Sequence, residues 1–149
     1  MSKSKDASMK RPYEVVVLVH PDATIEEQKQ VFKKNQSTIE SFKGSVFALE
    51  TWGKRNLANP IGKLRKAYFF HSFFEADPQA VTELERTMRI NDKVLRFMHT
   101  RLDERVSLSK HQEIFKKGLS ESAAREKERE VKMQARRAAF AAARSERAD

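Results

Sequence analysis

The chain contains no cysteine. This absence excludes disulfide bonds, thiolate-bound zinc, iron–sulfur clusters and thiol catalysis, and it fits a protein of the cytosol. No apolar run approaches the ~20 residues that a membrane-spanning helix requires. The opening residues, MSKSKDASMKR, are polar and lack the apolar segment of a signal peptide. We therefore expect a soluble, cytoplasmic protein without a membrane partner.

Acidic residues are in the minority. The 149 residues include 30 Lys and Arg against 21 Asp and Glu, which gives a formal net charge of +9 and a pI near 9.9. A domain pI above about 9 is a first indication of nucleic-acid binding. The alternative is a basic surface without a dedicated partner. The hydrophobic fraction of 39% is too high for a wholly disordered chain, so we expect one domain plus an appendage.

The stretch from Trp52 to Lys66 has no acidic residue and five basic ones. Its two glycines and Pro60 argue against a regular strand or helix throughout, and they predict a long basic hairpin loop between two strands. Lys and Arg at a loop tip neutralise phosphates and release counterions. Trp52 and Arg55 add stacking surfaces for an unpaired base. We interpret the loop as RNA-binding; the alternative is a loop that is merely solvated.

Six elements are predicted before residue 103, in the order strand, helix, strand, strand, helix, strand. Their approximate ranges are 13–20, 24–43, 45–52, 67–76, 78–90 and 94–102. This order predicts an α+β, ferredoxin-like split βαβ fold (βαββαβ). Right-handed crossovers then place two helices on one face of a four-stranded antiparallel sheet. The other face has no helix of this domain to cover it.

The helix ends have recognisable signals. Thr24 and Glu27 form the pattern of a capping box at the start of the first helix. Gly44 is placed to end that helix in the left-handed conformation. Asp77 followed by Pro78 is typical of a helix start, with Asp as the N-cap and Pro at the first position.

The two faces of the predicted sheet differ in role. Tyr13, Val15, Val17 and Val19 are predicted to face the core. The uncovered face is apolar enough to predict an interface. It carries these side chains: Val16, Leu18, Phe69, His71, Phe73, Arg96, Met98 and Thr100. Two alternatives stay open: the facing is reversed, or bases stack on the aromatic rings, as in a free-standing single-stranded RNA-binding module.

The ends of the chain differ from this domain. Residues 1–10 are predicted to be a disordered basic arm, residues 11–106 the ferredoxin-like RNA-binding domain, and residues 107–149 a charged C-terminal extension. Ala, Glu, Lys and Arg are good helix formers, so residues 120–147 should be helical, with a break at Gly118. The extension is expected to follow RNA or a partner protein; the alternative is a solvated tail.

The four histidines show no metal-ligand spacing: His20, His71, His99 and His111. His20 lies at a strand end, but no second acid, nucleophile or phosphate-binding glycine loop accompanies it. A small phosphate-handling enzyme is thus only the third hypothesis, after an RNA-binding protein with a partner on the sheet face and a free-standing RNA-binding module. We expect a non-enzyme that needs no metal, no cofactor and no small-molecule substrate.

Several motifs resemble the family of bacterial small-subunit ribosomal protein number six. The most specific are Trp52-Gly53-Lys54-Arg55, Leu57-Ala58, Pro60-Ile61 and Lys63, supported by Tyr13-Glu14, His20-Pro21, Arg89-Ile90-Asn91-Asp92, Val94 and Arg96. The resemblance covers about residues 11–103. The family usually has Tyr where this chain has Asn59. The acidic tails common in the family also differ from this basic one.

The resemblance implies a ferredoxin-like, non-catalytic structural constituent of the small ribosomal subunit. It implies binding to the central domain of small-subunit ribosomal RNA, cooperatively with small-subunit ribosomal protein number eighteen. With the residue patterns above, it gives two sets of candidate residues. The RNA-binding candidates are Arg11, Lys54, Arg55, Lys63, Arg65 and Arg89. The candidates for contact with the partner protein are Phe69, Phe73, Arg96 and Met98.

Overall fold

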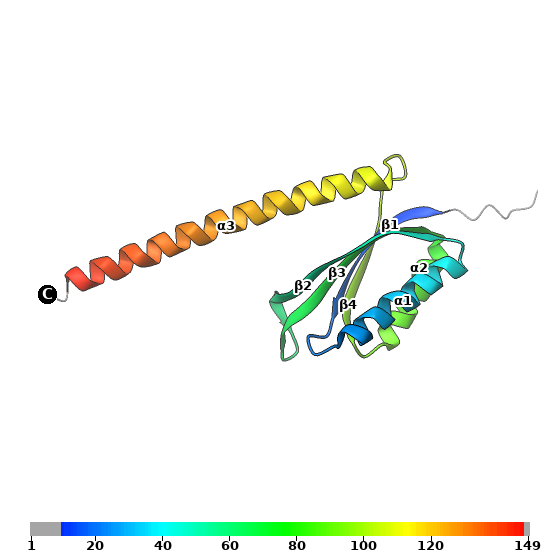
Figure 1. The fold of residues 1–149 in the computed structure, drawn as a ribbon, viewed down its shortest axis with the longest axis horizontal. Helices are drawn as coiled ribbons and strands as arrows, with labels where there is room; N and C mark the ends of the chain where they lie inside the picture. The colour runs from blue at the N-terminus through cyan, green and yellow to red at the C-terminus, as the bar shows by residue number, and fades with distance from the viewer. Residues whose placement is uncertain (1–9, 148–149) are drawn as a thin grey trace, which may run out of the picture. The chain divides into compact units, whose positions relative to one another are not determined.

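The computed structural model describes residues 10–147 (Figure 1). The elements are β1 (Arg11–Val19), α1 (Ile25–Ser41), β2 (Ser45–Ile61), β3 (Leu64–Ala76), α2 (Pro78–Ile90), β4 (Val94–Arg101) and α3 (Leu108–Glu146). The four strands form one sheet in the order β2-β3-β1-β4, and every neighbouring pair is antiparallel. The predicted ferredoxin-like α+β fold is confirmed. The chain divides into two compact units, the first ending at Leu108 and the second beginning at Ser109.

The core lies between the sheet and the helices α1 and α2, which cover one of its faces (Figure 1). Alternate residues of β1 point into it, and Val17 and Val19 are 1% and 0% exposed. The sheet also contributes Phe70 and Phe74, and α2 contributes Leu84 and Met88 among others. Each such side chain stabilises the fold by roughly 1.5–3 kcal/mol through burial. The predicted core face of the first strand is therefore confirmed.

The helix starts form as predicted. The Thr24 side chain accepts a hydrogen bond from the Glu27 N–H at 3.2 Å, and the Glu27 carboxylate accepts one from the Thr24 N–H at 2.9 Å. At α2, Asp77 accepts from the Gln79 N–H at 2.9 Å, and Pro78 occupies the first turn. These bonds satisfy amides that have no partner within the helix.

The predicted role of Gly44 is wrong in detail. The left-handed conformation after α1 belongs to Lys43, whose φ is 59°. Gly44 instead occupies a place without room for a side chain, because a Cβ there would collide with the Glu75 carbonyl oxygen, the Ala76 Cβ and the Ile39 side chain. The Gly44 N–H also donates to the Ile39 carbonyl at 2.9 Å. Glycine is thus needed for close packing of the α1–β2 connection against β3.

The predicted loop at 52–66 is also wrong, because most of it is strand. β2 and β3 continue to a two-residue turn, Gly62-Lys63, in which Gly62 has φ 59°. Glycine at the first turn position is typical of tight hairpins. Pairing shifts between Thr51 and Gly53 and between Asn56 and Ile61. These irregularities accommodate Pro60 because β2 is an edge strand, where a missing N–H is tolerated.

The C-terminal helix is confirmed but is longer than predicted. α3 contains 39 residues and runs through Gly118 without a break. A glycine inside a helix costs only about 1 kcal/mol relative to alanine, which good helix formers on both sides offset. The helix also begins at Leu108, before the predicted start at 120. Nearly all of the predicted N-terminal arm lies outside the described residues.

Candidate nucleic-acid interface

The basic side chains of the β2–β3 hairpin lie on both of its faces. Lys54 is opposite Tyr68 and Arg55 is opposite Ala67. Because side chains alternate along a strand, Lys54 and Arg55 point to opposite sides. Lys54 Nζ lies 5.3 Å from the centroid of the Tyr68 ring. The hairpin therefore offers cations to an anion on either face.

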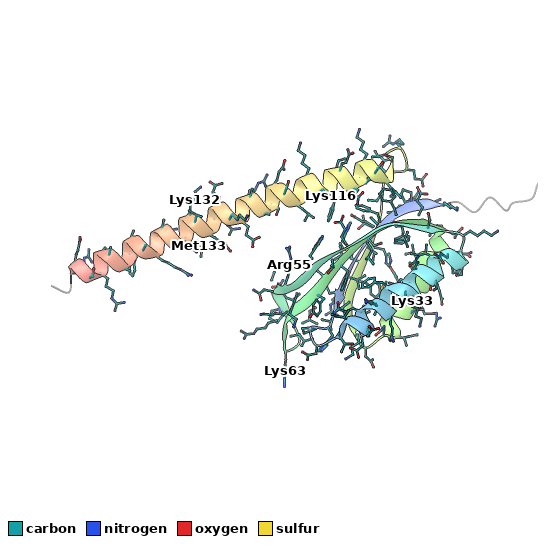
Figure 2. The ribbon with its side chains drawn as sticks, in the orientation of Figure 1. Lys33, Arg55, Lys63, Lys116, Lys132 and Met133 are labelled. Carbon is teal, nitrogen blue, oxygen red and sulfur yellow. The ribbon has the colours of Figure 1, made fainter. Side chains whose placement is uncertain are left out.

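Arg55 is held in place by Trp52. Its guanidinium carbon lies 5.8 Å from the centroid of the indole, and its Nε donates to the Trp52 carbonyl at 3.1 Å. An arginine has five N–H donors, and this bond uses one. The other donors of a positioned guanidinium suit a phosphate, whose oxygens accept two parallel bonds. Figure 2 shows Arg55 on the hairpin, with Lys63 at its turn.

The remaining cations of the hairpin are exposed. Lys63 lies in the turn, and Arg65 and Lys66 follow it on β3. Lys66 is opposite Asn56, on the same face as Lys54. Lys66 belongs to the predicted basic stretch but not to the predicted site residues, although alternation along β3 places it on the face of Lys54. Residues 51–74 contain no acidic side chain, so the hairpin itself supplies no carboxylate to neutralise this group.

The structure does not bring Arg11 and Arg89 into that group. Arg11 is opposite Ala76, at the end of β3 remote from the hairpin turn, and its Nε lies 3.7 Å from Glu104. Arg89 lies in the last turn of α2, where it pairs with Glu85 at 3.5 Å and lies over the ring of Phe97. Only the four hairpin residues of the predicted RNA-binding set form one cluster: Lys54, Arg55, Lys63 and Arg65. Contact with RNA stays a prediction for all six.

The sheet face opposite the helices carries the predicted side chains. Cross-strand pairs place Phe69 beside Leu18, and Leu18 beside Arg96. Met98 is 62% exposed, and Arg96 is exposed as well. Phe69 is half-buried. The exposed part of this face is therefore aliphatic and cationic.

Two residues of that face are buried, contrary to the expectation of an open apolar surface. Phe73 is 2% exposed and His71 is 1% exposed. The indole of Trp52 stacks on His71 at 5.9 Å and on Phe69 at 6.2 Å, and His71 meets the Phe73 ring edge-on at 4.6 Å. Phe73 therefore offers little surface to a partner. Trp52 covers the sheet, which leaves its ring less available to a base than predicted.

His71 is held by a carboxylate. Its Nε2 lies 3.1 Å from Glu14 Oε2, which comes from the neighbouring strand β1. This pair explains how a polar ring is accommodated between Trp52 and Phe73, since buried polar groups require hydrogen-bond partners. A histidine with these contacts has a structural role.

Two of the other histidines, His20 and His99, also have local contacts. His20 Nδ1 accepts from the Asp22 N–H at 3.0 Å. His99 Nδ1 lies 3.2 Å from Glu85 Oε1, and burial lowers the pKa of His99, an effect that the nearby Glu85 carboxylate opposes. Within residues 10–147, no group of three histidine or carboxylate side chains is arranged to hold a metal ion. No described helix combines the length and the apolar character of a membrane span.

Comparison with known proteins identifies relatives for most of the chain. Residues 12–101 match the family model of ribosomal protein S6. A Bdellovibrio bacteriovorus protein named small ribosomal subunit protein bS6 is 75% identical over 140 residues, which cover 94% of this chain and 92% of that protein. A protein of the same name from Geotalea uraniireducens is 39% identical over 66% of this chain and 77% of its own length. The crystal structure of 30S ribosomal protein S6 from Thermotoga maritima is similar with a TM-score of 0.58 and 26% identity, covering 62% and 88% of the two chains.

Proposed function

Because the chain belongs to the ribosomal protein S6 family of the small ribosomal subunit, we propose that it binds the central domain of small-subunit ribosomal RNA together with small-subunit ribosomal protein number eighteen. Its role is structural rather than catalytic. The observation that supports this proposal is the hairpin: it carries five cations and no carboxylate between residues 51 and 74. A projecting cationic arm of this kind suits the phosphate backbone of RNA.

The hairpin contacts phosphates through Lys54, Arg55, Lys63 and Arg65. Their side chains leave the strand on two faces and at the turn, so the arm fits between two segments of RNA backbone. Arg55 is already oriented by Trp52, which reduces the entropy lost when it binds. Phosphate contacts of this kind supply affinity and orientation, whereas base edges supply sequence discrimination.

The partner protein binds the exposed part of the open sheet face. Met98 and the half-buried Phe69 supply apolar surface. Arg96 lies on the same strand as Met98, opposite Leu18, which separates it from Phe69. Apolar surface with a charged group at its border is typical of protein interfaces. The alternative use of this face, stacking of bases, has less support because the aromatic rings on it are buried or half-buried.

The experiment is a salt titration of RNA binding. The double variant Lys54→Ala, Arg55→Ala should bind the central-domain RNA more weakly and should lower the slope of log K against log salt by about 0.7–0.9 for each phosphate that is no longer bound. The control is Lys29→Ala, Lys33→Ala, which removes two exposed cations from α1. If the hairpin variant and this control have the same slope, the hairpin does not contact phosphate.

A further inference from the structure

The helix α3 lies beyond the residues that match the family, and one side of it is basic. Arg125, Arg129, Lys132 and Arg136 follow one another at intervals of four, three and four residues. At 3.6 residues per turn these intervals place the four side chains within a sector of about 60°. All four are exposed. They form a continuous stripe, which we call the basic face.

No carboxylate interrupts the basic face. With a rotation of about 100° per residue, the glutamates of this segment all fall outside the sector; they are Glu121, Glu126, Glu128, Glu130 and Glu146. Among the described residues, Glu128 pairs with Lys132 from the side, at 2.7 Å. The three arginines have no ion pair within residues 10–147. The charge of the stripe is thus mostly available to a ligand.

Apart from the basic face, residues 121–146 of the helix present no broad apolar surface that a partner could bind. From residue 121 to residue 146 every side chain is exposed. The large apolar side chains there are Val131, Met133 and Phe140, which are 65%, 52% and 73% exposed. They do not form the broad apolar side that lets an amphipathic helix enter a membrane or a protein groove. The remaining small residues are mainly alanines, which bury little surface.

We propose that the basic face of α3 binds RNA phosphates, as a second contact separate from the hairpin. The stripe extends over twelve residues, 125–136, which are eleven steps of 1.5 Å or roughly 16 Å along the helix. Three of its four cations are arginines, whose planar guanidinium groups bind phosphate oxygens in pairs. Figure 2 labels Lys132 of this stripe and its neighbour Met133. The inference rests on the proposed function, which supplies RNA as the polyanion.

The test compares two variants of the full chain with equal charge. The first replaces the basic face by glutamine: Arg125→Gln, Arg129→Gln, Lys132→Gln and Arg136→Gln. The second replaces four cations on other sides of α3: Lys117→Gln, Lys127→Gln, Arg137→Gln and Arg144→Gln. Each lowers the formal net charge of +9 by four. Glutamine is a good helix former, so both should keep the helix, which circular dichroism checks.

Binding to in vitro transcribed central-domain RNA is measured across salt concentrations, with protein number eighteen present. The face variant should lower the slope of log K against log salt by about 3, since each bound phosphate contributes roughly 0.7–0.9. The control should lower it by less than about 1. Equal decreases in the two variants would mean that overall charge matters and the basic face does not.

Two further outcomes would also overturn the proposal. One is a face variant that binds RNA like the wild type while Lys54→Ala, Arg55→Ala weakens binding; the proposed function then stands and the inference fails. The other is a face variant that loses binding to phosphatidylglycerol vesicles but not to RNA. If both the face variant and the hairpin variant bind RNA like the wild type, the proposed function itself has failed. The hairpin variant thus distinguishes failure of this inference from failure of the proposed function.

Discussion

Position 44 requires glycine because there is no room for a side chain, and not because the backbone needs a conformation that only glycine adopts easily. A Cβ at this position would collide with Glu75, Ala76 and Ile39, so Gly44→Ala should lower the free energy of unfolding by about 1–3 kcal/mol. The matched change is Gly118→Ala in α3, where a Cβ meets no atom within 4 Å and helix propensity rises by up to about 1 kcal/mol. Urea unfolding and helix content measure the two effects. A Gly44→Ala variant as stable as the wild type would contradict this explanation.

His99 should make the stability of the domain depend on pH. Its side chain is 5% exposed, its Nε2 has no hydrogen-bond partner among the described residues, and burial lowers its pKa. The unfolded chain therefore takes up a proton at a higher pH than the folded chain does. Stability is lost as the pH falls below the ordinary histidine value near 6.5, by at most about 1.4 kcal/mol per pH unit for one proton.

Urea unfolding between pH 7.5 and 5 tests this dependence. The variant His99→Gln should lose less stability over that range than the wild type, because its side chain cannot take up the proton. His20→Gln removes a more exposed histidine, whose side chain is 26% exposed, and serves as the control. If the wild type and His99→Gln show parallel curves, His99 is not the group responsible.

At the scale of elements, the starts of the two helices could be predicted from sequence, because they depend on contacts between residues that are close together in the chain. The start of α1 depends on Thr24 and Glu27, which are three residues apart, and the start of α2 depends on adjacent residues. The hairpin itself was predicted, but its strand pairing was not, because the two strands were expected to end at Trp52 and to begin at Ala67. Gly53 and Pro60 usually interrupt a strand, but here register shifts in an edge strand accommodate them.

The candidate site could be predicted only in part. The charge of the hairpin follows from sequence alone, and alternation along β3 would have added Lys66. The burial of His71 did not follow, because the indole of Trp52 stacks on it from the neighbouring strand. The burial of Phe73 did not follow either, since alternation along the strand placed it on the open face. Nor did the separation of Arg11 from the hairpin follow, since it needs the register of β1 against β3.

At the scale of the whole molecule, we expect that the proposed RNA-binding hairpin and the proposed protein-binding sheet face can be changed independently. Met98 is 62% exposed on the sheet face away from the helices, so Met98→Glu should leave the fold intact. It should weaken the binding of small-subunit ribosomal protein number eighteen by about tenfold or more, because an unpaired carboxylate buried at the interface costs at least about 1.4 kcal/mol.

The control for this variant is Ile25→Glu, a matched change of an apolar side chain that is 69% exposed at the start of α1. It should leave the binding of the partner protein within about twofold. Both are measured by calorimetric titration without RNA, and then by RNA binding with and without the partner. The proposed function expects Met98→Glu to reduce the cooperative gain while RNA binding by the protein alone is little changed. If RNA binding alone falls as far as pairing does, the sheet face contacts RNA directly, and the free-standing RNA-binding module becomes the better description of this domain.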